Sequence, residues 1–124
     1  MNKIHIQFLL LPFLISLPVL AGCSKTGSTA LAPDKIPTAM NDAFKKSSGE
    51  AKELASECAS ACQCQNVTTA FVDLQKLSQS KELTPEQRAV TARAMATTFQ
   101  KLRSASDSGD PSAQALLHQY LSTR

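Results

Sequence analysis

Apolar residues in the C-terminal two-thirds of the chain recur at the spacing of helices. From Thr38 onward they fall at intervals of three and four residues, which places their side chains on one face of an α-helix. No stretch alternates apolar and polar residues for long enough to indicate a strand. Five such segments are separated by short polar breaks. The sequence therefore predicts an all-α fold, a small bundle of about five short helices arranged as antiparallel helical hairpins.

The predicted core consists of the residues on these apolar faces. In chain order, they are Met40, Ala43 and Phe44; Leu54, Ala55, Cys58, Ala61 and Cys62; Val67, Ala70, Phe71, Leu74 and Leu77; Val90, Ala94, Met95, Phe99 and Leu102; and Ala113, Leu116, Leu117, Tyr120 and Leu121. Many are Ala or Leu, which favour helices, while β-branched and aromatic residues are sparse throughout this part of the chain.

Capping residues predict where several helices begin. Thr84-Pro85-Glu86-Gln87 combines a capping threonine, a proline at the first helical position and a glutamine three residues after the cap. Asp110-Pro111 repeats the cap and proline at the last helix. Asn66 is the expected N-cap of the third helix. Ser47 with Glu50 is a candidate capping box for the second.

The N-terminus has the organisation of an export signal. Lys3 supplies a short basic start, and an apolar run from Phe8 to Ala21 follows it. This run is short and contains Pro12 and Pro18, which makes it unsuited to span a membrane. Residues 1–22 are thus predicted to be a signal peptide. Residues 23–37, polar and containing two prolines, are predicted to be a flexible tether, and 38–124 the helical domain.

The residues at the end of this segment, Leu20-Ala21-Gly22-Cys23, match the bacterial lipobox at all four positions. The chain therefore resembles a bacterial lipoprotein. The resemblance implies cleavage before Cys23, a thioether-linked diacylglyceryl group on its sulfur, and an acyl chain such as palmitate on the new amino terminus. Several acyl chains bind a membrane durably, since each buried methylene contributes about 0.8 kcal/mol. Ser24, rather than Asp, implies the periplasmic face of the outer membrane rather than the inner membrane.

Composition narrows the range of functions. Cleavage of residues 1–22 leaves 102 of the 124 residues, enough for one small domain. Loss of Lys3 leaves 12 basic against 10 acidic residues, a net charge of +2. The basic residues are scattered, with Lys45-Lys46 the only adjacent pair, so no nucleic-acid partner is expected. Glu50, Glu53 and Glu57 form an acidic stripe that is expected to face solvent.

Residues 54–77 resemble a tetratricopeptide-type helical hairpin. Gln65-Asn66-Val67-Thr68-Thr69-Ala70 stands where that family prefers Gly-Asp-Tyr-x-x-Ala, with Gln65 and Val67 replacing the usual Gly and Tyr. Phe71 and Leu74 occupy its apolar positions. The chain is also similar to small uncharacterised alanine-rich helical proteins. The tetratricopeptide resemblance implies contact with a protein partner, because such modules bind partner segments in a groove.

Three cysteines form the one unusual cluster. Cys58 and Cys62 are four residues apart, which places both thiols on one helix face, and Cys64 follows. They are either packing residues, or thiols that handle copper or zinc. A closed zinc site normally needs four ligands, and the remaining candidate is the distant His118. A disulfide is a third possibility, and with Cys23 lipidated at least one thiol has no intrachain partner.

No arrangement of nucleophile and base is recognisable, and phosphate-binding glycine loops are absent. The sequence therefore predicts no catalytic residues and no cofactor. The expected function is a non-enzymatic, lipid-anchored interaction module of the cell envelope. The alternative is a thiol- or metal-handling envelope protein that uses Cys58, Cys62 and Cys64.

Overall fold

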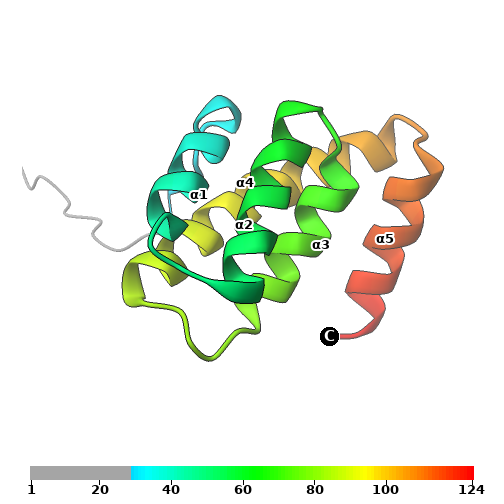
Figure 1. Cartoon of the computed structure of the whole chain (residues 1–124). Helices are drawn as coiled ribbons and strands as arrows, with labels where there is room; N and C mark the ends of the chain where they lie inside the picture. The colour runs from blue at the N-terminus through cyan, green and yellow to red at the C-terminus, as the bar shows by residue number, and fades with distance from the viewer. Residues whose placement is uncertain (1–28) are drawn as a thin grey trace, which may run out of the picture.

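A computed structural model describes residues 29–124, and this part of the chain is all-helical (Figure 1). The predicted signal peptide, Cys23 and the first part of the predicted tether lie outside the described residues. A 3-10 turn, η1 (Pro33–Lys35), leads into five α-helices. These are α1 (Ile36–Phe44), α2 (Gly49–Gln63), α3 (Val67–Ser78), α4 (Pro85–Asp107) and α5 (Pro111–Ser122). The predicted fold class, five short helices joined by short loops, is confirmed.

Helix formation begins earlier than the apolar pattern indicates. The sequence places the start of the first helix near Thr38 and assigns residues 33–37 to the tether. In the structure these residues form η1 and the first turn of α1, and Ile36 is buried in the core. Pro33 and Pro37 occupy the first or second positions of these elements, where a backbone amide would have no acceptor within the helix, so proline costs no hydrogen bond there. The prolines therefore start helical turns rather than prevent them.

Three of the four predicted caps form. The Asn66 carboxamide oxygen accepts a hydrogen bond from the Thr69 amide, and Asp110 accepts from the amides of Ser112 and Ala113. Thr84 and Gln87 make the reciprocal bonds of a capping box. The predicted Ser47–Glu50 box does not form, because α2 begins one residue later with Ser48 as its N-cap. The Ser47 hydroxyl instead accepts a hydrogen bond from Gln87 Nε2 at 2.8 Å.

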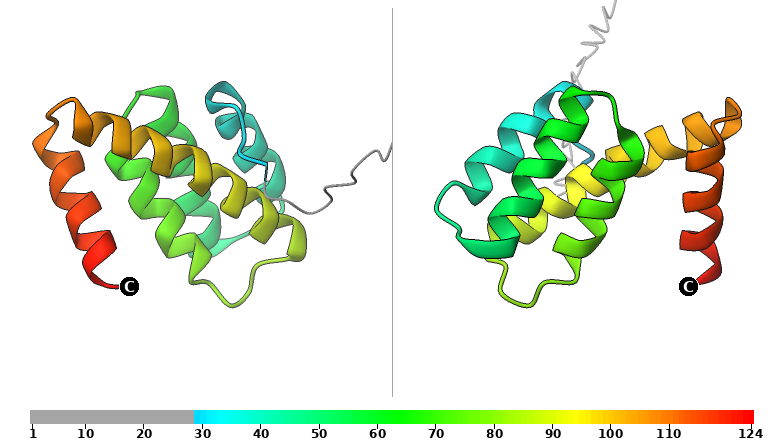
Figure 2. Two further views of the ribbon diagram at one scale, coloured as in Figure 1. Left: turned by 180° about the vertical axis from the view of Figure 1, so that it is seen from behind. Right: turned by 45° about the vertical axis from the view of Figure 1, so that its right-hand side comes forward.

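The long helix α4 organises the fold. At 1.5 Å per residue its 23 residues span about 34 Å, and it packs against α1, α3 and α5. The helices α1, α2 and α3 pack side by side in chain order, and α4 crosses behind them as seen in Figure 1. Figure 2 shows α5 standing at one end of the molecule, far from α1. It packs on α4 and, over a shorter length, on α3.

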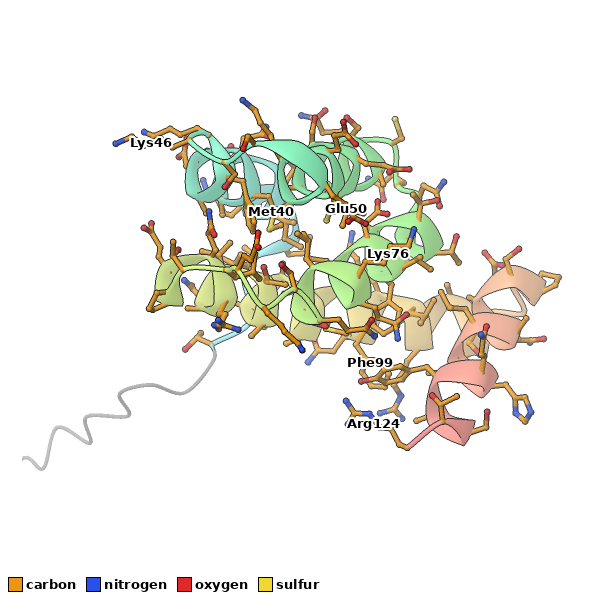
Figure 3. The ribbon with its side chains drawn as sticks, turned by 60° about the horizontal axis from the view of Figure 1, so that its bottom comes forward. Met40, Lys46, Glu50, Lys76, Phe99 and Arg124 are labelled. Atoms are coloured by element: carbon orange, nitrogen blue, oxygen red, sulfur yellow. The ribbon has the colours of Figure 1, made fainter. Side chains whose placement is uncertain are left out.

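Two apolar clusters fill the interior. The larger joins α1, α2, α3 and α4, with Met40, Phe44 and Leu74 among its fully buried members. The smaller fixes α5 to α3 and α4. At its centre, the Phe71 ring lies 5.1 Å from Tyr120 edge-to-face and 6.0 Å from Phe99. Phe99 projects toward the end of the chain at Arg124, whose guanidinium lies over the Tyr120 ring (Figure 3).

The C-terminal helix is less buried than its apolar pattern predicts. Only Ala113 of α5 is fully buried, while Leu116, Leu117 and Tyr120 are half-buried. Leu121, expected in the core, is 57% exposed. The reason is that, within residues 29–124, α5 packs only against α3 and α4, which cover one of its sides.

Candidate functional site

The cysteines lie at the C-terminal end of α2 in three different environments. Cys58 is fully buried, Cys62 is half-buried and Cys64 is exposed, and all three are free thiols. Cys58 fits the expectation of a small apolar packing residue, in contact with the main core. Cys64 is the C-cap of α2 and points away from that core. The helix thus separates residues that are close in sequence.

Cys58 and Cys62 differ in acidity because they interact with each other. A hydrogen bond between the two thiols is the largest cause of a raised pKa at Cys58 and of a lowered pKa at Cys62. Burial and the nearby carboxylate of Asp73 raise the pKa of Cys58 further. At Cys62, the positive charge of Lys101 also lowers the pKa, against burial and Asp73. Cys62 is therefore the thiol that ionises more readily.

The metal hypothesis requires ligands that the helices do not bring together. Across residues 29–124, no three His, Cys, Asp or Glu side chains are grouped so that they could hold one ion. His118 is exposed on α5, and α5 makes no contact with α2. The candidate ligands Cys58, Cys62 and Cys64 therefore lie near one end of α2, and His118 is not beside them.

Cys62 lies in a recess at the junction of η1, α1, α4 and the loop between α2 and α3. The recess has a volume of about 260 Å³, and most of its walls are apolar. Ile36, Val67, Ala70 and Ala105 supply apolar surface, and its polar lining includes Cys62, Gln65, Thr98, Lys101 and Ser104. Cys62 and Lys101 also line a second, more polar hollow, here called the outer hollow, whose lining includes Asp34. This pairing of Cys62 with Lys101 was not visible in the sequence, because 39 positions separate them.

Gln65 has a left-handed backbone beside Cys62. Its φ of 62° is the one positive value at a non-glycine residue among the described residues. It ends α2 in a Schellman motif, in which the Asn66 amide donates to Ala61 O at 2.8 Å and the Gln65 amide to Cys62 O at 3.3 Å. Gly109 occupies the equivalent position after α4. Glycine would adopt this backbone conformation at position 65 with less strain than glutamine.

A second candidate site is a groove between α3 and α5, which we call the α3–α5 groove. It has a volume of about 430 Å³ and is open along one side. The α2 and α3 side is formed by Glu57, Thr68, Thr69, Val72, Asp73 and Lys76, and the α5 side by Ser112, Ala115, Leu116 and Gln119.

Asp73 is the unusual residue of this groove. It is only 2% exposed, and its Oδ2 atom has no hydrogen-bond partner. Burial raises the pKa of Asp73, the Glu57 carboxylate raises it further, and Lys76 partly opposes them. An unpartnered buried carboxylate is unfavourable for folding, and such groups concentrate at functional sites. The apolar pattern did not reveal it, because Asp73 stands between two predicted core positions of α3, Phe71 and Leu74.

The remaining predicted features are simpler. Glu50, Glu53 and Glu57 are all exposed, as expected for a solvated helix face. None of the helices in the described part of the chain is both long and apolar enough to cross a membrane.

Comparison with protein-family models, with curated proteins and with solved structures finds no match to this chain.

Proposed function

We propose that this chain is a lipid-anchored protein of the bacterial cell envelope whose helical domain is a non-enzymatic interaction module. Its partner is a protein segment that carries a Lys or Arg side chain among apolar residues, bound in the α3–α5 groove. The lipobox Leu20-Ala21-Gly22-Cys23 supports the anchor, and Ser24 favours the outer membrane. The single observation that carries the binding proposal is the buried, unpartnered carboxylate of Asp73 in the groove.

The charge of the groove determines the chemistry of the partner. Glu57 and Asp73 give it two carboxylates against the one ammonium of Lys76. Lys76 is exposed and makes no hydrogen bond to Asp73 Oδ2. A partner cation in the groove beside Asp73 would compensate the buried negative charge, in a site of low solvent access where charge interactions are strong. Val72, Ala115 and Leu116 provide apolar contact for the residues on either side of it.

The position of the groove is compatible with the anchor. Thr29 stands six positions after Cys23, so the chain between them reaches at most about 20 Å. The Thr29 carbonyl accepts a hydrogen bond from Arg93 Nε at 2.8 Å, and the Leu31 amide donates to Arg93 O at 3.3 Å. These bonds fix residues 29–31 to α4, and the two views of Figure 2 place α5 at the other end of the molecule. The groove then remains accessible beside a lipid surface.

The anchor is tested by mass spectrometry of the amino terminus. The mature protein should begin at an acylated Cys23, and Cys23→Ala should abolish the modification and remove the protein from the membrane fraction. Recovery of an unmodified chain that begins at Met1 would refute the anchor and leave the groove proposal untouched.

The groove is tested with a displayed library of random peptides, selected on the mature protein in detergent. Selected peptides should share a Lys or Arg flanked by apolar residues. Asp73→Asn should weaken their binding at least about tenfold, because it removes the charge that faces the cation. Asp42→Asn, at an exposed position on α1, is the matched control and should have no effect. Peptides without a basic residue, or equal binding to Asp73→Asn, would overturn the proposal.

A further inference from the structure

The recess around Cys62 lies on another part of the molecule from the α3–α5 groove, and its chemistry is different. It combines a half-buried thiol, a fully buried neighbouring thiol and an ammonium group above mostly apolar walls. Cys64, two residues further on, does not line the recess and is exposed. The reactivity of Cys62, a thiol in a recess, can therefore be compared with that of Cys64, a solvent-exposed thiol of the same chain.

We propose that Cys62 is a site of reversible S-thiolation that takes a small thiol with an apolar body and a carboxylate, delivered as a low-molecular-weight disulfide. The apolar walls of the recess accommodate the body of the attached group. Lys101 attracts its carboxylate. This site is independent of the proposed binding function.

The reaction is a thiol–disulfide exchange in which the small disulfide is itself the oxidant. The Cys62 thiolate attacks one sulfur of that disulfide, whose S–S bond breaks as a new one forms to Cys62. The other half leaves as a thiolate and is thereby reduced. A lowered pKa at Cys62, due first to the hydrogen bond from Cys58 and then to Lys101, increases the fraction of attacking thiolate.

The product should remain a mixed disulfide rather than pass to Cys58. Residues four apart on a helix have Cβ atoms about 5–6 Å apart, whereas a disulfide needs about 3.5–4.5 Å. Cys58 is also fully buried on the face of α2 that packs into the main core. An intrachain bridge would therefore require local distortion of α2, and a second external thiol is the expected agent of release.

The proposal is tested with two aromatic disulfides on the reduced mature protein in detergent. Dithiobis(nitrobenzoate) carries a carboxylate on each half, and dithiodipyridine is neutral. Peptide mass spectrometry should find Cys62 labelled before Cys64 by the anionic reagent. We compare the rate at which the anionic reagent labels Cys62 with the rate at which the neutral reagent does. Lys101→Met should lower the ratio of these two rates about five-fold, the effect of one nearby charge in a well-solvated setting. Lys101→Met also changes the fraction of Cys62 that is thiolate, but this change affects the rates of both reagents equally and cancels in their ratio.

Control variants separate a local effect from a general one. Lys52→Met changes an exposed lysine on α2 outside the recess and should leave the ratio unchanged. Asp34→Asn removes a negative charge from the outer hollow and should raise the ratio slightly. Labelling of Cys64 as fast as Cys62, or an unchanged ratio in Lys101→Met, would overturn the proposal.

Discussion

Replacement of the buried carboxylate of Asp73 by the nearly isosteric amide in Asp73→Asn should stabilise the domain at neutral pH. In the wild-type protein this side chain is 2% exposed and its Oδ2 has no hydrogen-bond partner. The Glu57 carboxylate adds repulsion to the desolvation. Burial of an uncompensated polar group destabilises proteins by about 1–3 kcal/mol in mutational data. Because the amide keeps part of that penalty, the expected gain is about 1–2 kcal/mol at pH near 7.

The pH dependence gives a sharper test than the gain alone. Folding raises the pKa of Asp73 above its ordinary value of 3.8, so the folded state binds more protons than the unfolded state in the window just above that value. Stability contributed by the protonated group is therefore fully present below 3.8 and is lost as the pH rises through the folded pKa. The free-energy difference between Asp73→Asn and wild type should be near zero at low pH and grow toward neutrality.

The measurement is urea unfolding followed by far-UV circular dichroism, on both proteins, from pH about 3 to about 7. All other carboxyl groups are common to the two proteins and cancel in the difference. Asp42→Asn, exposed on α1, is the control and should show no pH-dependent difference. A destabilised Asp73→Asn at neutral pH, or a difference independent of pH, would refute the reasoning. A variant that is more stable yet binds cationic peptides less well would show that wild-type Asp73 sacrifices stability for binding.

Three further substitutions test the fold by thermal or urea unfolding. Phe71→Ala removes the central ring of the α3–α4–α5 cluster and should destabilise the domain by about 3–5 kcal/mol. Leu121→Ala, at an exposed position, should change the stability little. Equal losses of stability in the two variants would contradict the burial of Phe71 in the core. Gln65→Gly relieves a left-handed backbone and should stabilise by about 1 kcal/mol, and a loss would mean that the glutamine side chain is needed. Thr84→Ala should lose about 1 kcal/mol with the capping box. Ser48→Ala, at an N-cap without a side-chain bond, should be neutral, and an equal loss at both caps would contradict the assignment.

Much of the fold follows from local sequence. The three- and four-residue apolar spacing predicts the helices, and Asn66, Thr84 and Asp110 predict where three of them begin. These features were predictable because a helix period and a cap bond involve residues within a few positions of one another. The lipobox is equally local, and the proposed anchor on Cys23 rests on the sequence alone.

Other features depend on which helices become neighbours. Ser47 is hydrogen-bonded to Gln87 of α4, a contact that no local pattern contains, and Ser48 rather than Ser47 is the N-cap of α2. Ile36 becomes core because α1 packs against α2 and α4. Leu121 is exposed because α5 is the last helix and nothing covers its outer side within residues 29–124.

The candidate sites also depend on tertiary structure. The sequence drew attention to Cys58, Cys62 and Cys64, but α2 places the first in the core, the second in a recess and the third in solvent. Lys101 reaches Cys62, and Asp73 is buried beside Glu57, only because α2, α3 and α4 pack together. Side-chain type and spacing along one helix are written in the sequence. The burial and the charges contributed by other helices are not, and these determine what a thiol or a carboxylate can do.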